Sequence, residues 1–183
     1  MKGKLYILSG PSGAGKGTVC KQLIKERPDI VLSISMTTRP PRADEKNGVN
    51  YFFTDKQSFL KIKEDGGFLE CAGHFDNYYG TPRAFVVDNL EKGRDVLLEI
   101  EPVGALQVKA QMPESVLIFL TAPSKDDLIA RLRSRGSETE ETIAKRMAKA
   151  ETELSQMDKY DYVVLNDTVE NAVKKIEKIM GGK

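Results

Sequence analysis

The stretch that most constrains the fold lies near the start of the chain: Ser9-Gly10-Pro11-Ser12-Gly13-Ala14-Gly15-Lys16-Gly17-Thr18, directly after the apolar run Leu5-Tyr6-Ile7-Leu8. Residues 10–16 fit the pattern G-x-x-x-x-G-K, in which glycines let successive backbone N–H groups surround phosphate oxygens. The pattern carries this meaning only between a strand and a helix, which is the context that the flanking residues predict. We therefore expect the loop to bind the polyphosphate of ATP, through Ser12, Gly13, Ala14, Gly15, Lys16, Gly17 and Thr18.

One position of this loop departs from the common pattern. Gly17 follows Lys16, where a serine or threonine usually supplies a hydroxyl to Mg²⁺. Thr18 comes one residue later, and we expect it to meet the metal directly or through water. The plainer alternative for the whole stretch is a glycine-rich turn with a surface lysine.

Apolar bursts alternate with helical patterns along the rest of the chain. We predict strands at residues 5–8, 31–35, 96–100, 116–120 and 162–165, and helices at 18–26, 102–111, 124–135 and 169–180. The strands are continuously apolar rather than alternating, which is typical of a parallel sheet covered on both faces. The sequence therefore predicts an α/β fold.

Two regions interrupt this alternation. Residues 37–94 are rich in Gly, Pro, Tyr and Phe and contain short strand-like pieces, so we predict an inserted, partly β lobe. Residues 137–160 are highly charged with few strongly apolar side chains, and we predict an exposed helix there.

Composition excludes several functional classes. The net charge of +1 argues against a generally basic nucleic-acid binder. A single histidine, His74, makes a zinc site of His and Cys improbable, and any Ser-His-Asp relay would need that residue. Cys20 and Cys71 are too few for a disulfide framework, and we read all three residues as packing or surface side chains. No apolar run reaches the length of a membrane span, so we expect a cytoplasmic protein without membrane contact.

Four further segments carry a resemblance: Ser35-Met36-Thr37-Thr38-Arg39-Pro40-Pro41-Arg42, Gly48-Val49-Asn50-Tyr51-Phe52-Phe53, Phe68-Leu69-Glu70 and Asn77-Tyr78-Tyr79-Gly80-Thr81-Pro82. Together with the phosphate loop, they make the chain resemble guanylate kinase, a nucleoside monophosphate kinase of the P-loop superfamily. The resemblance implies one domain over residues 4–179, with a three-layer α/β/α core, an inserted GMP-binding lobe at about 37–94 and a helical lid at about 125–150. It implies Mg²⁺-dependent phosphoryl transfer from ATP to GMP.

The residue chemistry agrees with an acceptor site for GMP. The guanidinium groups of Arg39 and Arg42 suit a dianionic phosphate, and two prolines between them stiffen the loop. Guanine presents two neighbouring donors that one carboxylate, Glu70, can accept, whereas adenine lacks them. The resemblance implies the full acceptor set: Ser35, Arg39, Arg42, Tyr51, Glu70, Tyr79, Gly80, Thr81 and Glu101.

The donor side and the metal complete the expected site. Glu99 and Glu101 end a strand and share one face, at the sheet edge where ligands bind in α/β proteins. The resemblance assigns Glu99 to Mg²⁺ and Glu101 to the guanine amino group. It assigns Arg131, Arg135 and Asn166 to ATP, and a catalytic set of Lys16, Arg42, Arg135 and Arg146 that neutralises the transferred charge. Val103 stands where the family usually has glutamine, so any contact of that glutamine is absent.

Plainer readings stay open for these side chains: solvated arginines, a surface glutamate at position 70, core tyrosines and exposed strand-end acids. A kinase for AMP or a pyrimidine nucleotide would share the phosphate loop and the lid arginines. A non-catalytic scaffold that binds protein ligands is the alternative from another class, although such modules tend to have eroded phosphate loops. The expected partners are ATP and GMP, with no nucleic acid, no membrane and no obligatory protein partner.

Overall fold

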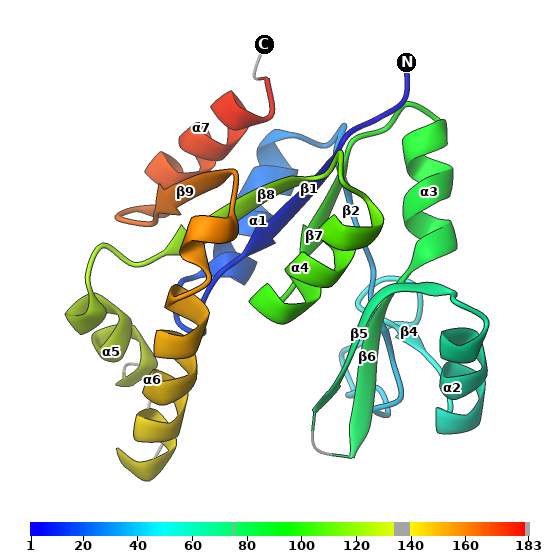
Figure 1. Cartoon of the computed structure of the whole chain (residues 1–183), viewed down its shortest axis with the longest axis horizontal. Coiled ribbons are helices and arrows are strands. Elements are labelled where there is room, and N and C mark those ends of the chain that lie inside the picture. Colours follow the sequence, from blue (N-terminus) through cyan, green and yellow to red (C-terminus); the bar gives the residue numbers. More distant parts are fainter. Residues whose placement is uncertain (75, 134–139, 182–183) are drawn as a thin grey trace.

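A computed structural model describes residues 1–74, 76–133 and 140–181. Its larger sheet has five parallel strands in the order β2-β7-β1-β8-β9. The strands are β1 (Leu5–Ser9), β2 (Val31–Leu32), β7 (Val96–Glu99), β8 (Val116–Thr121) and β9 (Tyr162–Leu165). The phosphate loop leaves the central strand, so it lies at the middle of the sheet's carboxyl edge (Figure 1).

Helices cover both faces of this sheet because its strands are apolar on both sides. Tyr6 and Leu8 of β1 pack with α1 (Lys16–Glu26) and α7 (Val169–Ile179). Leu5 and Ile7 point the other way and pack with α3 (Arg83–Glu91) and α4 (Pro102–Gln111). The predicted α/β fold with a parallel sheet in a three-layer core is therefore confirmed.

A second, mixed sheet lies beside the first (Figure 1). Its strand order is β4-β3-β6-β5, with β3 (Met36–Thr37), β4 (Phe52–Phe53), β5 (Phe68–His74) and β6 (Asn77–Pro82). Helix α2 (Lys56–Glu64) packs on it through Phe59, whose ring stacks on Phe68 and Tyr78 at centroid distances of 4.4 and 5.6 Å. This sheet is the partly β insertion that the sequence predicts.

Three local details differ from the sequence-based expectation. The strand predicted at 31–35 stops at Leu32, because the chain crosses at Ser33–Ser35 to the second sheet, where Phe52 N donates to Ser35 O. The insertion contains two helices, α2 and α3, that were not predicted. Although α3 lies within residues 37–94, its Val86 and Leu90 pack on the first sheet.

The lid region contains α5 (Lys125–Arg133) and α6 (Glu140–Leu154), followed by a short 3₁₀ turn, η1 (Met157–Lys159). Ser124 starts α5: its Oγ accepts from Asp127 N at 3.1 Å and donates to the Asp127 carboxylate at 2.6 Å. Ser124 thus caps the first turn of α5. Leu128 and Ala150 join the two helices in a small apolar cluster. This pair and the second sheet lie on opposite sides of the carboxyl end of β1 (Figure 1).

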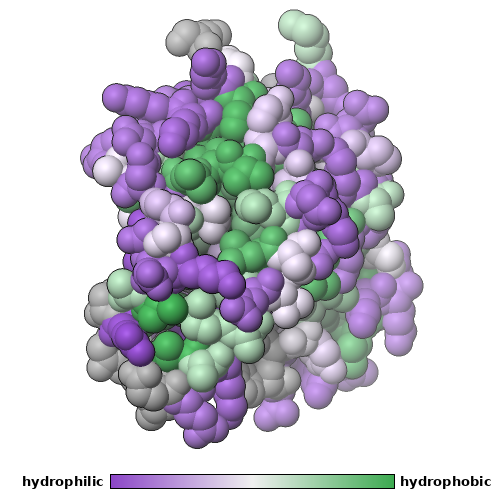
Figure 2. All heavy atoms as spheres, turned by 60° about the vertical axis from the view of Figure 1, so that its left-hand side comes forward, coloured by the Kyte–Doolittle hydropathy of each residue, from purple (hydrophilic) through white to green (hydrophobic). Residues whose placement is uncertain are grey.

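The edge strand β9 exposes Tyr162, Val163 and Leu165, and buries only Val164. Figure 2, which brings that side of the molecule forward, shows hydrophobic residues grouped among hydrophilic ones. In the described part of the chain, no helix has the length and apolar character needed to cross a membrane.

Candidate functional site

The phosphate loop joins β1 to α1 through a backbone that requires glycine. Gly10 has φ +144° and packs so closely on β8 that a Cβ would lie 1.9 Å from Leu120 O. Gly15 has φ +90° and is the residue before α1. These two positions let β1 pass directly into α1, which directs the positive end of the helix dipole at the loop.

Lys16 is the first residue of α1 and folds back over the loop. Its Nζ donates to Gly10 O at 2.6 Å and to Pro11 O at 3.2 Å. Burial lowers the pKa of Lys16, and the nearby carboxylates of Glu153 and Glu99 oppose that shift. The result is a partly desolvated cation at the mouth of the loop, which is suited to an anionic ligand.

Two residues from other elements, Asn166 and Arg131, hold the backbone of the phosphate loop. Asn166, which follows β9, is buried, and its Nδ2 donates to Ala14 O at 2.8 Å. Arg131 of α5 donates to Asn166 O at 2.6 Å and contacts Ala14 O at 3.5 Å. In this structure both residues thus support the loop backbone.

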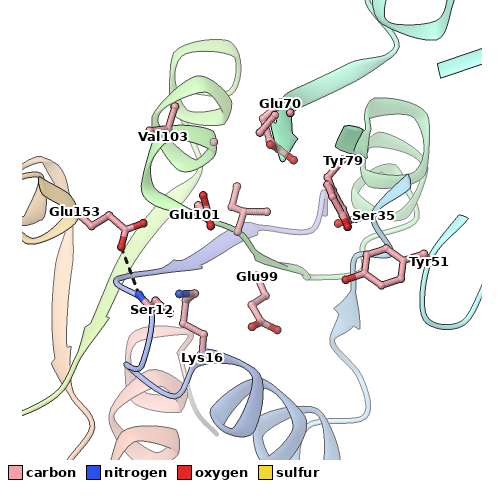
Figure 3. A pocket seen from close by; sticks show the side chains of 14 residues that line it. Ser12, Lys16, Ser35, Tyr51, Glu70, Tyr79, Glu99, Glu101, Val103 and Glu153 are labelled. Carbon is pink, nitrogen blue, oxygen red and sulfur yellow. Dashed lines mark hydrogen bonds between the residues drawn. The ribbon is translucent and has the colours of Figure 1, made fainter. Parts of the chain in front are cut away.

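A cavity of about 460 Å³ opens between the loop and the second sheet (Figure 3). That volume is within the range of small-molecule sites. Residues from distant parts of the chain line it: Ser12, Lys16, Ser35, Tyr51, Glu70, Ala72, Gly73, Tyr79, Glu99, Ile100, Glu101, Val103, Gly104 and Glu153. Eight of these fourteen are residues that the sequence predicts for the site, namely Ser12, Lys16, Ser35, Tyr51, Glu70, Tyr79, Glu99 and Glu101.

The base-reading candidate Glu70 is almost fully buried at one end of this cavity. Thr81 Oγ1 donates to its Oε1 at 2.7 Å. Burial raises the pKa of Glu70, and the hydrogen bonds from Thr81 oppose that shift. Gly80, beside Thr81, pairs with Met36 and Cys71 of the neighbouring strands. A buried carboxylate with one oxygen already oriented is a suitable acceptor for a ligand with paired donors.

The candidate phosphate-binding arginines differ in their surroundings. The Arg39 guanidinium lies 5.5 Å from the centroid of the Tyr51 ring and forms an ion pair with Glu45 at 2.8 Å. Tyr51 in turn packs edge-on against Tyr79, with ring centroids 6.1 Å apart. Arg42 is exposed. Neither arginine lines the cavity itself, but Arg39 lies directly behind a lining residue.

Acidic side chains cluster at the carboxyl end of β7. Glu99 projects into the cavity beside Lys16 (Figure 3), and burial raises the pKa of Glu99 while Lys16 opposes the shift. Glu101 precedes α4, and its Oε1 accepts from Lys149 of α6 at 2.8 Å. Thr18 is exposed on α1 and does not line the cavity, whereas Gly17 faces Glu99: a Cβ there would be 3.4 Å from Glu99 Oε1.

The carboxylate of Glu99 is suited to a weakly held magnesium ion. Among the described residues, no group of three or more His, Cys, Asp or Glu side chains is arranged to hold a metal. Mg²⁺ commonly takes one or two carboxylates and completes its shell with water and substrate phosphates. One carboxylate, Glu99, beside Lys16 of the loop matches that behaviour.

Two other predicted residues, Arg146 and Arg135, fall in the segment that we expect to be a lid. Arg146 is half-buried on α6. Arg135 lies outside the described residues. The remaining predicted loop positions, Gly13 and Ala14, form the loop itself, with Ala14 N donating to Pro11 O at 3.2 Å.

Sequence reasoning missed Glu153. It lies on α6, and its Oε2 accepts from Ser12 N of the phosphate loop at 3.4 Å (Figure 3). Burial raises the pKa of Glu153, and Lys149 and Lys16 oppose the shift. Nothing in the surrounding charged helical sequence distinguishes this glutamate from its exposed neighbours, so only the fold identifies it.

Comparisons with known proteins agree on one family. Residues 2–183 match the family model described as guanylate kinase. The chain is 52% identical over 179 residues to a guanylate kinase of Caldanaerobacter subterraneus subsp. tengcongensis, covering 98% of this chain and 87% of that protein. It is 50% identical over 182 residues to one of Clostridioides difficile, covering 100% of this chain and 89% of that protein.

Solved structures give the same result. The crystal structure of guanylate kinase from Anaplasma phagocytophilum superimposes with a TM-score of 0.78 at 35% identity, covering 98% of this chain and 85% of that one. A shikimate kinase from Bacteroides thetaiotaomicron, at 12% identity and a TM-score of 0.51, shares the fold alone.

Proposed function

The chain belongs to the guanylate kinase family, and from that membership we propose that it transfers the γ-phosphoryl group of ATP to GMP, giving ADP and GDP with Mg²⁺. As a member of this family it is an enzyme, an ATP:GMP phosphotransferase of the nucleoside monophosphate kinase class. The reaction would serve purine nucleotide metabolism. We also propose that residues 4–179 act as one domain, with the acceptor lobe at about 37–94 and the lid at about 125–150.

One observation carries the proposal. The lysine of the phosphate loop, Lys16, and a buried carboxylate of the second sheet, Glu70, line the same cavity. A cation suited to phosphates and an acceptor suited to guanine thus face one space, which supports a donor and an acceptor nucleotide meeting there.

The proposed mechanism is direct, in-line transfer between two bound nucleotides. The phosphate loop, from Ser12 to Thr18, binds the triphosphate, with Lys16 moving from Gly10 O to the β- and γ-phosphates. Arg39, Tyr51 and Tyr79 orient the GMP phosphate, and Arg42 adds charge. Positioning and charge neutralisation supply the catalysis, so no covalent intermediate is needed.

Guanine is selected at the end of the cavity that contains Glu70. Glu70 accepts from N1–H and the exocyclic amino group, Ser35 and Thr81 meet O6, and Glu101 adds a contact to the amino group. Gly80 belongs to the same acceptor set. AMP lacks the paired donors and would leave the buried Glu70 carboxylate with its contacts to Thr81 alone, and that penalty supports selection against adenine.

The metal and the lid complete the proposal. Glu99 and, through water or directly, Thr18 would hold Mg²⁺, which would supply positive charge against the charge that develops on the phosphates. Arg131, Arg135 and Arg146 would close on the triphosphate, with Arg135 and Arg146 joining Lys16 and Arg42 in the catalytic set. Asn166 would act on the ATP side by holding the loop backbone. Closure keeps water from the reacting phosphate.

The test is product analysis with the purified protein. ATP, GMP and Mg²⁺ should yield equal amounts of ADP and GDP, and Lys16→Met should lower the rate by about 1000-fold without unfolding the chain. If wild-type protein produced no GDP, or if Lys16→Met retained full activity, the proposal would be wrong.

A further inference from the structure

The loop between β3 and β4 contains both candidate acceptor arginines, Arg39 and Arg42, and the carboxylate of Glu45 links them. Glu45 Oε1 accepts from Arg39 Nη2 at 2.8 Å, and Glu45 Oε2 accepts from the backbone N–H of Arg42, also at 2.8 Å. The Glu45 N–H in turn donates to Arg42 O at 3.1 Å. Both oxygens of this side chain are therefore used to fix positions 39 and 42 relative to one another.

Other contacts of Arg39 show what this fixation achieves. Its Nη1 donates to Pro40 O at 2.8 Å, and its guanidinium lies over the rings of Tyr51 and Phe53, at 5.5 and 6.0 Å from their centroids. Glu45 thus holds the guanidinium from one side while aromatic rings cover the other. Since Tyr51 lines the cavity, the guanidinium is kept beside the proposed place of the acceptor phosphate.

The Glu45 carboxylate is ionised and partly shielded. The hydrogen bond from Arg39 lowers the pKa of Glu45, and the bond from the Arg42 backbone adds to that effect. Its side chain is 12% exposed and that of Arg39 is 18% exposed, so water competes little for the pair.

We infer that Glu45 is a positioning residue of the acceptor site, which preorganises Arg39 and the Arg42 segment to receive the phosphate of GMP. This inference rests on the proposed function. Simple electrostatics predicts the opposite effect, because a negative charge near an anion site should weaken the binding of GMP. The charge of Glu45 is already paired with Arg39, so its repulsion of the phosphate is small, whereas an unanchored arginine and a mobile loop must be ordered each time the ligand binds. We therefore expect the positioning effect to exceed the repulsion.

Positioning and repulsion predict opposite changes in the KM for GMP of Glu45→Gln: loss of positioning raises this KM, and loss of repulsion lowers it. An amide keeps one acceptor oxygen but places an NH₂ group against one of the two donors, so the loop loses one anchor. The KM for GMP should rise about tenfold, while the KM for ATP stays within about twofold and kcat falls by a smaller factor. Asp44→Asn is the matched control: it removes the same charge from the exposed neighbouring residue and should leave the KM for GMP unchanged or slightly lower.

Glu45→Asp keeps the negative charge and changes only the reach of the side chain. It replaces Glu45→Gln as the test variant if Glu45→Gln folds poorly. It retains the charge but is too short to reach both donors, so the KM for GMP should again rise several-fold. Steady-state kinetics on all three variants with varied GMP and varied ATP, together with melting curves, make the test. Wild-type turnover of GMP with an unchanged or lower KM in Glu45→Gln and Glu45→Asp would overturn the inference alone. Absence of wild-type turnover would overturn the proposed function and this inference with it.

Discussion

Gly104 and Glu70 pack so closely that a Cβ on the glycine would lie 2.8 Å from Glu70 Oε2 and 3.3 Å from its Cδ. Gly104 lies in the first turn of α4, and Glu70 lies in β5, so this contact joins the first sheet's helix layer to the second sheet. Any side chain at position 104 must push the buried carboxylate out of its place.

Gly104→Ala should therefore damage the acceptor site selectively. Displacement of the Glu70 carboxylate should raise the KM for GMP about tenfold, corresponding to about 1.4 kcal/mol, and leave the KM for ATP unchanged. Steady-state kinetics check this, with Gln107→Ala, an exposed residue of the same helix that does not line the cavity, as control. An unaltered KM for GMP in Gly104→Ala would show that Glu70 does not read the base from this position.

Glu70→Gln should lower kcat/KM for GMP about 100-fold, because hydrogen bonds to a charged acceptor are worth about 1.5–3 kcal/mol each. The wild-type value should also fall on acidification, since protonation removes the charged acceptor. Because burial raises the pKa of Glu70, this fall should begin at a higher pH than for an ordinary glutamate. A pH profile of kcat/KM identical in wild type and Glu70→Gln would contradict the assignment.

The same substitution makes a prediction about stability. A carboxyl whose folded-state pKa is raised binds its proton more tightly in the folded chain, so it destabilises the fold as pH rises through that pKa. Glu70→Gln should therefore melt above wild type at pH 7 in the absence of nucleotide. The difference should vanish below the unfolded-state pKa of about 4.5. Melting curves between pH 4 and 8 measure it, and a lower melting temperature at pH 7 would be the contrary result.

Gly17→Ser should restore the hydroxyl that the phosphate loop lacks. A Cβ at this position meets Glu99 Oε1 at 3.4 Å, an ordinary contact, so the residue fits beside the proposed metal ligand. The Mg²⁺ concentration needed for half-maximal activity should fall about threefold. Gly17→Ala adds the carbon without the oxygen and should leave the metal requirement unchanged. Equal behaviour of the two variants would argue against a metal between this position and Glu99.

Asn166→Ala should destabilise the fold and loosen the donor site. The substitution removes the buried hydrogen bond to Ala14 O and costs about 1–3 kcal/mol of unfolding free energy. The KM for ATP should rise several-fold because the loop loses its support. Chemical denaturation and kinetics test this, with Asn171→Ala, an exposed residue of α7, expected to change stability by less than about 0.5 kcal/mol. Equal stabilities of the two variants would refute the proposed support.

The parts of the fold that the sequence predicts well are those decided locally. The bounds of β9 and α4 are as predicted, because an apolar run ends in polar residues at Asn166 and a proline opens the helix at Pro102. The phosphate loop was recognisable because its glycines are required by the backbone itself. The insertion was recognised only as partly β, since α2 is amphipathic over just nine residues and α3 packs on the first sheet instead of the second.

The parts that could not be predicted depend on contacts between distant elements. Glu153 reaches Ser12 from 141 residues away, and Asn166 reaches Ala14 from 152 residues away. No local pattern encodes either contact. The space that admits Glu70 beside Gly104 likewise depends on how α4 meets β5.

Acceptor selectivity is best measured as ADP formation from Mg-ATP by the wild-type protein with GMP, AMP, CMP and UMP offered separately. We expect turnover with GMP and rates at least about 100-fold lower with the other three, because only guanine satisfies the buried Glu70 carboxylate. Comparable or faster turnover with AMP or a pyrimidine nucleotide would contradict this expectation: the phosphate loop would keep its place as the donor site, and the acceptor assignment would be wrong.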